Sequence, residues 1–75
     1  MSATASSQML IVQLNGETRR VAAGCTIAAM LRALGIAPER VAVERNREIV
    51  PRSTLDSVEV SEGDAFEIVH FVGGG

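Results

Sequence analysis

Apolar and polar residues alternate along the first part of the chain with the two-residue period of a β-strand. The apolar residues of segment 10–14 fall on one side, and Asn15-Gly16 follows, a pair that accepts the positive φ angles of a tight hairpin turn. The returning segment 17–22 is more polar, which is typical of a strand that is partly exposed to water. The pattern therefore predicts a β-hairpin over residues 9–22.

The period then changes to that of an amphipathic helix. Four apolar residues are spaced so that they share one helical face, namely Ile27, Met30, Leu31 and Leu34. Thr26 is placed to cap the N-terminus of this helix, and Gly35 stands where a helix C-terminus favours a positive φ. Pro38 prevents the helix from continuing. These start and stop signals predict one short helix between Thr26 and Gly35.

The rest of the chain has the signals of short strands separated by turns. The expected elements are a strand over 41–44, a turn at Asn46-Arg47, a short strand at 49–50 ended by Pro51, one helical turn over 53–57, a turn at 62–64 and a last strand over 65–72. This order predicts an α+β fold of the β-grasp type, in which one main helix covers one face of a mixed sheet of four to five strands. We expect a disordered leader over 1–8, the domain over 9–72 and a flexible glycine tail over 73–75.

The composition narrows the chemistry that the chain can perform. Hydrophobic residues make up 47% of its 75 residues and charged residues 21%, which is typical of a folded globular protein. The net charge is −2 and there is no lysine, which argues against nucleic-acid binding and excludes Schiff-base chemistry. One cysteine, Cys25, and one histidine, His70, form neither an internal disulfide nor a zinc site. We expect a cytoplasmic protein that does not enter a membrane, with Cys25 as a small packing residue and His70 in no catalytic role.

The most unusual feature is the terminal run Gly73-Gly74-Gly75. Glycines let a backbone enter a narrow slot in another protein, so the reactive group of such a tail is the carboxylate of Gly75. A carboxylate becomes an acyl donor only after activation by ATP, yet the chain has neither a phosphate-binding loop with lysine nor a paired nucleophile and histidine. This predicts a carrier rather than an enzyme, without a bound cofactor or metal, whose partner uses the ATP. The alternative is an inert, flexible end.

The last strand also predicts a surface for that partner. Alternation places Phe66 and Ile68 under the helix, so that Val69 and Phe71 lie on the uncovered face. If the first strand is adjacent, Ile11 and Gln13 lie beside them. We expect this exposed apolar patch next to the tail to be a protein interface.

Three arginines cluster around the short strand at 49–50. Arg45, Arg47 and Arg52 either contact an acidic partner or form a solvated surface of mixed charge with Glu44 and Glu48. We include Arg52, which lies just after Pro51, with Val69 and Phe71 in the expected partner interface.

Several segments together resemble a known family. They are Leu14-Asn15-Gly16-Glu17, Ala23-Gly24-Cys25-Thr26, Val41-Ala42-Val43-Glu44-Arg45-Asn46, Ile49-Val50-Pro51-Arg52, Gly63-Asp64, Glu67-Ile68-Val69 and Val72-Gly73-Gly74-Gly75. In these residues the chain resembles the thiamine-biosynthesis sulfur carriers, small β-grasp proteins related in fold to ubiquitin. The resemblance covers residues 9–75, and the chain departs from the family pattern in its leader and at Cys25.

The resemblance implies a specific reaction sequence. An adenylyltransferase of the ubiquitin-activating type would adenylate Gly75, with Gly73 and Gly74 as the tail that enters its slot. Sulfur from a cysteine-derived persulfide would then give a thiocarboxylate (1-thioglycine) at Gly75, which would donate the sulfur to thiazole synthase. Three alternatives stay open: the small subunit of molybdopterin synthase, a ubiquitin-like protein modifier and an interaction domain with an inert tail.

Overall fold

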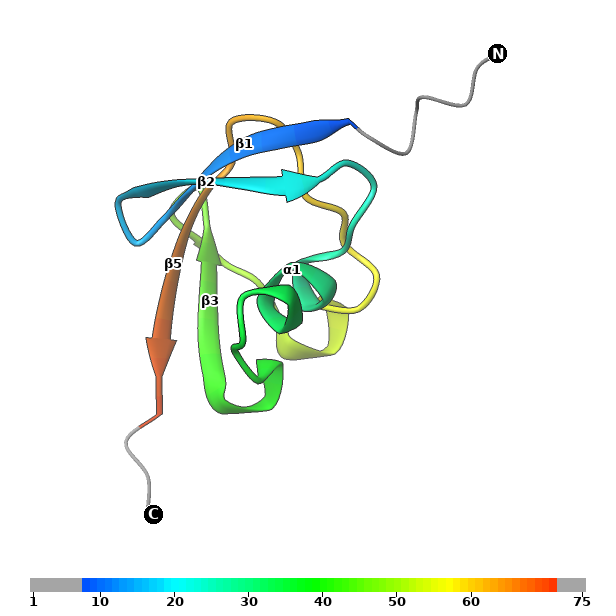
Figure 1. Ribbon diagram of the computed structural model, residues 1–75. Coiled ribbons are helices and arrows are strands. Elements are labelled where there is room, and N and C mark those ends of the chain that lie inside the picture. The colour runs from blue at the N-terminus through cyan, green and yellow to red at the C-terminus, as the bar shows by residue number, and fades with distance from the viewer. Residues whose placement is uncertain (1–7, 72–75) are drawn as a thin grey trace.

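The structure is a computed structural model that describes residues 8–71 (Figure 1). The strands and the main helix follow the predicted order, but the 3-10 helix over 38–40 was not predicted, and the helical turn predicted over 53–57 is a 3-10 helix over 52–54. The elements are β1 (Met9–Leu14), β2 (Glu17–Ala22), α1 (Ile27–Ala33), the 3-10 helix η2 (Pro38–Arg40), β3 (Val41–Arg45), β4 (Glu48–Ile49), the 3-10 helix η3 (Arg52–Thr54) and β5 (Ala65–His70). Residues 1–7 of the expected leader and the whole expected glycine tail lie outside the described residues, whereas the Gln8 carbonyl accepts a hydrogen bond from Ala23 N–H at 3.1 Å.

The five strands form one mixed sheet in the order β2-β1-β5-β3-β4. The pair β1–β5 is parallel, and the pairs β1–β2, β3–β4 and β3–β5 are antiparallel. Helix α1 lies against one face of this sheet (Figure 1). The predicted α+β fold of the β-grasp type is confirmed.

Two hairpin turns use residues with positive φ. Asn15 and Gly16 have φ angles of 51° and 84° between β1 and β2, as the Asn-Gly pair predicts. Asn46 and Arg47 have φ angles of 52° and 73° between β3 and β4. Arginine is strained in this region because its Cβ approaches the following carbonyl oxygen, so the second turn is less favourable than the first.

Helix α1 has the caps expected from its sequence. The Thr26 hydroxyl accepts a hydrogen bond from Ala29 N–H at 3.1 Å, which satisfies one of the free donors of the first turn. Gly35 has a φ of 80°, and Ile36 N–H closes the last turn by donating to the Leu31 carbonyl at 2.8 Å. The helix therefore begins and ends within one residue of the predicted limits.

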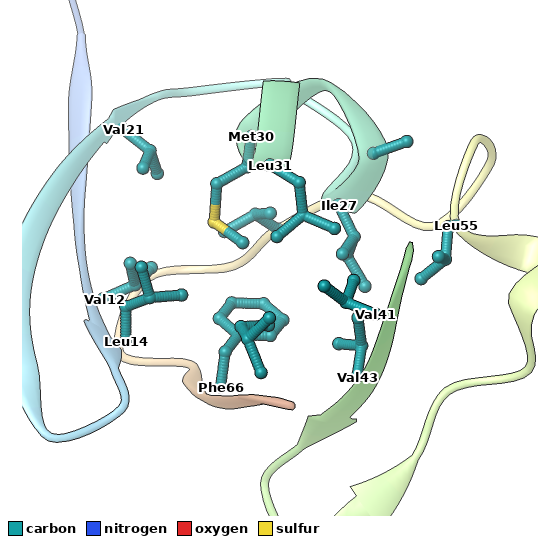
Figure 2. Packing of buried hydrophobic residues seen from close by; sticks show 13 residues of the cluster. Val12, Leu14, Val21, Ile27, Met30, Leu31, Val41, Val43, Leu55 and Phe66 are labelled. Carbon is teal, nitrogen blue, oxygen red and sulfur yellow. The ribbon is translucent and has the colours of Figure 1, made fainter. Parts of the chain in front are cut away.

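The core lies between α1 and the sheet. Thirteen apolar residues are buried in it: Val12, Leu14, Val21, Ile27, Ala28, Met30, Leu31, Val41, Val43, Leu55, Val60, Phe66 and Ile68. Phe66, which is 1% exposed, lies beneath Met30 and Leu31, between the side chains of β1 and those of β3 (Figure 2). The predicted inward orientation of Phe66 and Ile68 is confirmed.

A buried carboxylate fixes the turn that leads into β5. Asp64 is 5% exposed and accepts hydrogen bonds from Arg45 Nε at 3.0 Å, Asn46 Nδ2 at 3.1 Å and Ser61 N–H at 2.8 Å. Donors from the β3–β4 turn and from the turn before β5 thus meet at one charged group. These bonds offset the cost of burying it.

Strand β5 is shorter than the predicted segment 65–72. Its last residue, His70, pairs with Val41, which is the first residue of β3. Beyond this pair, β3 has no further residue with which β5 could pair. Phe71 N–H makes one more hydrogen bond, to the Arg40 carbonyl at 3.0 Å. Val72 lies outside the described residues.

Candidate functional site

Two exposed apolar residues lie at the end of β5: Val69 within the strand, on the face opposite the buried Phe66 and Ile68, and Phe71 directly after it. Val69 is 60% exposed and Phe71 is 52% exposed. Val69 lies opposite Ala42 of β3. The predicted exposure of this patch is confirmed, and its role as a partner interface stays a prediction.

The expected neighbours of the patch are wrong. Strand β1 pairs with β5 only through Gln13–Ala65 and Leu14–Phe66, and the two strands are parallel. Gln13 therefore lies level with the start of β5 and Ile11 lies before it, whereas Val69 is further along towards the C-terminus. Adjacency of two strands does not fix their register, and the stagger between β1 and β5 separates Ile11 and Gln13 from the patch.

Asn15, which follows β1, is hydrogen-bonded to the backbone of β5 beyond the point where the two strands pair. Its N–H donates to the Phe66 carbonyl at 2.8 Å. Its side chain makes two hydrogen bonds to the backbone of Ile68. The Oδ1 atom accepts from Ile68 N–H at 2.7 Å, and Nδ2 donates to the Ile68 carbonyl at 3.3 Å. The asparagine amide thus replaces a missing strand residue. The sequence predicts Asn15 only as a turn residue, since nothing local indicates this distant contact.

The three arginines near the short strand have different contacts. Arg45 is bonded to the buried Asp64, and Arg47 lies in the exposed β3–β4 turn. Arg52 instead donates from Nη1 to the Glu39 carbonyl at 2.7 Å, and its guanidinium carbon lies 5.0 Å from the ring centroid of Phe71. Of the three, only Arg52 contacts a residue of the exposed patch in this structure.

Cys25 and His70 lie in different parts of the fold. Cys25 is partly buried against the core and borders an apolar cavity of about 310 Å³ between β2 and α1. Burial raises the pKa of its thiol, its backbone hydrogen bond opposes this effect, and the nearby Glu59 carboxylate adds to it. The thiol is therefore protonated at neutral pH and a poor nucleophile, as a packing residue would be. His70 is exposed at the end of β5.

Residues 8–71 contain neither a group of metal-binding side chains nor a helix that could span a membrane. No three side chains of the metal-binding types lie together in this region. No helix within it has both the length and the apolar character needed to cross a bilayer.

Comparison with known proteins identifies the family. The model of the ThiS family matches residues 12–75, which is most of the chain and includes the terminal glycines. The chain belongs to the ThiS family. The resemblance to the thiamine-biosynthesis sulfur carriers is thereby confirmed.

Relatives and a solved structure agree with ThiS membership. The sulfur carrier protein ThiS of Bacillus subtilis is 39% identical over 66 residues, which cover 87% of this chain and all of that protein. A thiazole synthase of Magnetococcus marinus is 50% identical over 64 residues, which cover 85% of this chain but only 20% of that protein. This chain therefore spans about a fifth of the length of that relative. The crystal structure of a ThiS from Geobacter metallireducens has a TM-score of 0.75 at 36% identity and covers 88% of this chain and all of that one.

Proposed function

We propose that this chain carries sulfur as a thiocarboxylate on Gly75 and delivers it to a thiazole synthase for thiamine biosynthesis. The observation that carries the proposal is the match to the ThiS family. This match continues through residue 75 and therefore includes the terminal glycines, of which Gly75 has the carboxylate that would react. The sulfur-carrier name of the Bacillus subtilis relative supports the same role. In this role the chain is a protein carrier and a co-substrate of other enzymes.

The first step is activation of Gly75 by a partner. A carboxylate is a poor acyl donor because its negative charge is delocalised and oxide is not a leaving group. An adenylyltransferase removes this barrier: a Gly75 oxygen attacks the α-phosphorus of ATP, pyrophosphate leaves and an acyl-adenylate forms. The groups that stabilise the phosphate charge belong to the partner. The carrier contributes a tail that has no side chains to obstruct entry.

The second step installs sulfur. The terminal sulfur of a cysteine persulfide attacks the Gly75 carbonyl carbon and AMP leaves, which gives an acyl disulfide. A thiol then attacks the cysteine sulfur of this acyl disulfide, forms a new disulfide with that cysteine and releases the thiocarboxylate. Its sulfur is a better nucleophile than a carboxylate oxygen and transfers to an electrophilic carbon of the acceptor, after which hydrolysis restores the Gly75 carboxylate.

The patch formed by Val69 and Phe71 is the docking surface in this proposal. Both residues are more than half exposed; Val69 lies on β5, the strand that leads to the tail, and Phe71 directly follows that strand. Contact with a partner at these residues would bury apolar surface and would also bring Gly75 towards the partner's active site.

Thiazole synthase is the proposed acceptor because of what the Magnetococcus marinus relative contains. A segment half identical to this chain occurs within a protein named for thiazole synthesis. A carrier and its acceptor enzyme that share one polypeptide act at high effective concentration on one another. This relationship supports a thiazole acceptor over the pterin acceptor of molybdopterin synthase.

Growth without thiamine tests the proposal. We expect the chain to restore growth of a bacterial strain that lacks its own ThiS, and we expect deletion of Gly75 to abolish this restoration. Arg20→Ala, a surface change on β2 far from β5, serves as the matched control and should restore growth fully. Growth with the Gly75 deletion, at equal protein abundance, would favour an inert tail. Conjugates of higher mass that depend on Gly75 would favour a protein modifier.

A further inference from the structure

Arg52 joins two segments that are far apart in the sequence. Its Nη1 donates to the Glu39 carbonyl at 2.7 Å, and its guanidinium carbon lies 5.0 Å from the ring centroid of Phe71. Glu39 belongs to η2, which precedes β3, whereas Phe71 follows the last residue of β5. The guanidinium therefore connects the turn before β3 with Phe71, which precedes the first tail glycine, Gly73, by two residues.

Phe71 has few other restraints. It lies beyond the β3–β5 ladder, and its N–H makes one hydrogen bond, to the Arg40 carbonyl at 3.0 Å. The residue is 52% exposed and is not among the residues buried in the core. The Arg52 guanidinium lies over the ring, and the neighbouring carbonyls of Glu39 and Arg40 hold the guanidinium and the Phe71 backbone to the same turn.

We infer that Arg52 is a positioning residue for the tail: it holds Phe71 and thereby sets the direction in which the chain leaves the sheet. The inference rests on the proposed function, since direction matters only if a partner receives the tail. Restraining Phe71 in advance reduces the conformational entropy that is lost on docking and raises the fraction of encounters in which Gly75 reaches the partner's active site.

Arginine suits this position better than lysine. A planar guanidinium can stack on a ring and still donate from its edge to a carbonyl oxygen, whereas an ammonium group is a point charge that cannot present a flat face. Arg52→Lys is therefore expected to keep part of the restraint, and Arg52→Ala none of it.

Amide hydrogen exchange tests the restraint without any partner. In Arg52→Ala, we expect the exchange rate of Phe71 N–H, measured by NMR, to rise about twofold to tenfold, in line with the loss of one cation–π contact and one hydrogen bond. In Arg52→Lys, the exchange rate of Phe71 N–H should lie between those of the unsubstituted chain and Arg52→Ala. The Glu67 amide, which lies within the ladder, should exchange as before. An unchanged rate at Phe71 would overturn the inference, and so would an equal rise at both amides, which would indicate general destabilisation.

Activation kinetics test the consequence. With the adenylyltransferase of the same organism, ATP and varied carrier concentration, we measure pyrophosphate release for the unsubstituted chain, Arg52→Ala, Arg52→Lys and the charge-matched control Arg20→Ala. We expect Arg52→Ala to lower kcat about threefold to tenfold with little change in KM, because docking is retained while delivery of Gly75 is impaired. Arg52→Lys should recover part of this loss, and Arg20→Ala should have no effect.

Two kinetic results would overturn the inference. A higher KM at unchanged kcat would make Arg52 a direct docking contact, and unchanged kinetics with faster Phe71 exchange would show that the restraint is irrelevant to transfer. If the unsubstituted chain releases no pyrophosphate, the proposed function fails, while the exchange measurement still decides whether Arg52 restrains Phe71.

Discussion

Glu44 and Glu67 lie directly opposite each other on β3 and β5, and both are exposed on the face that carries Val69. Neither carboxylate forms a salt bridge to another residue of the described region. Like charges that face one another across strands repel, so this pair lowers the stability of the free protein. It also places negative charge beside the apolar patch that we propose as the docking surface.

Removing one of these charges should stabilise the chain. We expect Glu67→Gln to raise the free energy of unfolding by about 0.2–0.5 kcal/mol, measured by urea titration, and we expect about 1 M salt to remove most of this gain. Glu48→Gln is the matched control, because Glu48 faces Arg45 rather than another carboxylate and should give no gain. A destabilised Glu67→Gln protein would show that the pair does not repel.

The Asn15 side chain should contribute to stability through its contact with Ile68 rather than through the turn. Glycine tolerates the φ of 51° at this position, so Asn15→Gly removes both side-chain hydrogen bonds without straining the turn. We expect a loss of about 1–3 kcal/mol in the free energy of unfolding, since a partly buried backbone donor and acceptor lose their partners. An unchanged urea midpoint would mean that water replaces the amide at no cost.

Substitution by glycine in the second hairpin, at Arg47, should raise the free energy of unfolding instead of lowering it. Arg47 has a φ of 73° and makes no side-chain hydrogen bond to another described residue. Arg47→Gly relieves the strain of the left-handed backbone but also increases the conformational entropy of the unfolded chain. We expect the first effect to be larger, so that the free energy of unfolding rises by about 0.5–1 kcal/mol. Comparison with Asn15→Gly in one urea series separates turn strain from tertiary contact. A loss at Arg47 would contradict this explanation.

The two hairpins also show what the sequence can predict. Asn15-Gly16 indicates a turn and the alternation around it indicates two strands, because both depend on local backbone preferences. The stagger of β1 against β5, and hence the position of Ile11 relative to Val69, depends on packing between segments about fifty residues apart. The stack of Arg52 on Phe71 has the same origin. Local patterns therefore predicted the elements and the outward face of β5, but not which residues lie beside that face.

Cys25 should react slowly because burial raises the pKa of its thiol. An exposed cysteine has a pKa of about 8.5. We expect the rate of Cys25 alkylation by iodoacetamide to reach its midpoint at a higher pH than that. Because the folded-state pKa exceeds the unfolded one, the group's contribution to stability is complete below the unfolded pKa and is lost as the pH rises through the folded pKa. Cys25→Ser should remove that decline. Faster alkylation than in a denatured control would contradict a buried, protonated thiol.

The docking role of the exposed patch has a direct test. We expect Val69→Arg to weaken binding to the adenylyltransferase about tenfold or more, measured by calorimetry, because a charge would enter an apolar contact. The free protein should keep its stability, since Val69 is 60% exposed. Thr18→Arg on β2, also exposed, is the control. Equal affinity for Val69→Arg and the unsubstituted chain would place the interface elsewhere.

Mass spectrometry of the C-terminal peptide would detect sulfur on Gly75 itself. The chain is incubated with ATP, a persulfide donor and its adenylyltransferase, treated with a thiol-alkylating reagent and cleaved by trypsin after Arg52. The resulting peptide 53–75 contains neither methionine nor cysteine, so methionine oxidation cannot imitate the exchange of oxygen for sulfur. We predict an alkylated thiocarboxylate at Gly75 that requires ATP. An unmodified Gly75 carboxylate, with an enzyme shown to be active on another carrier, would contradict the account.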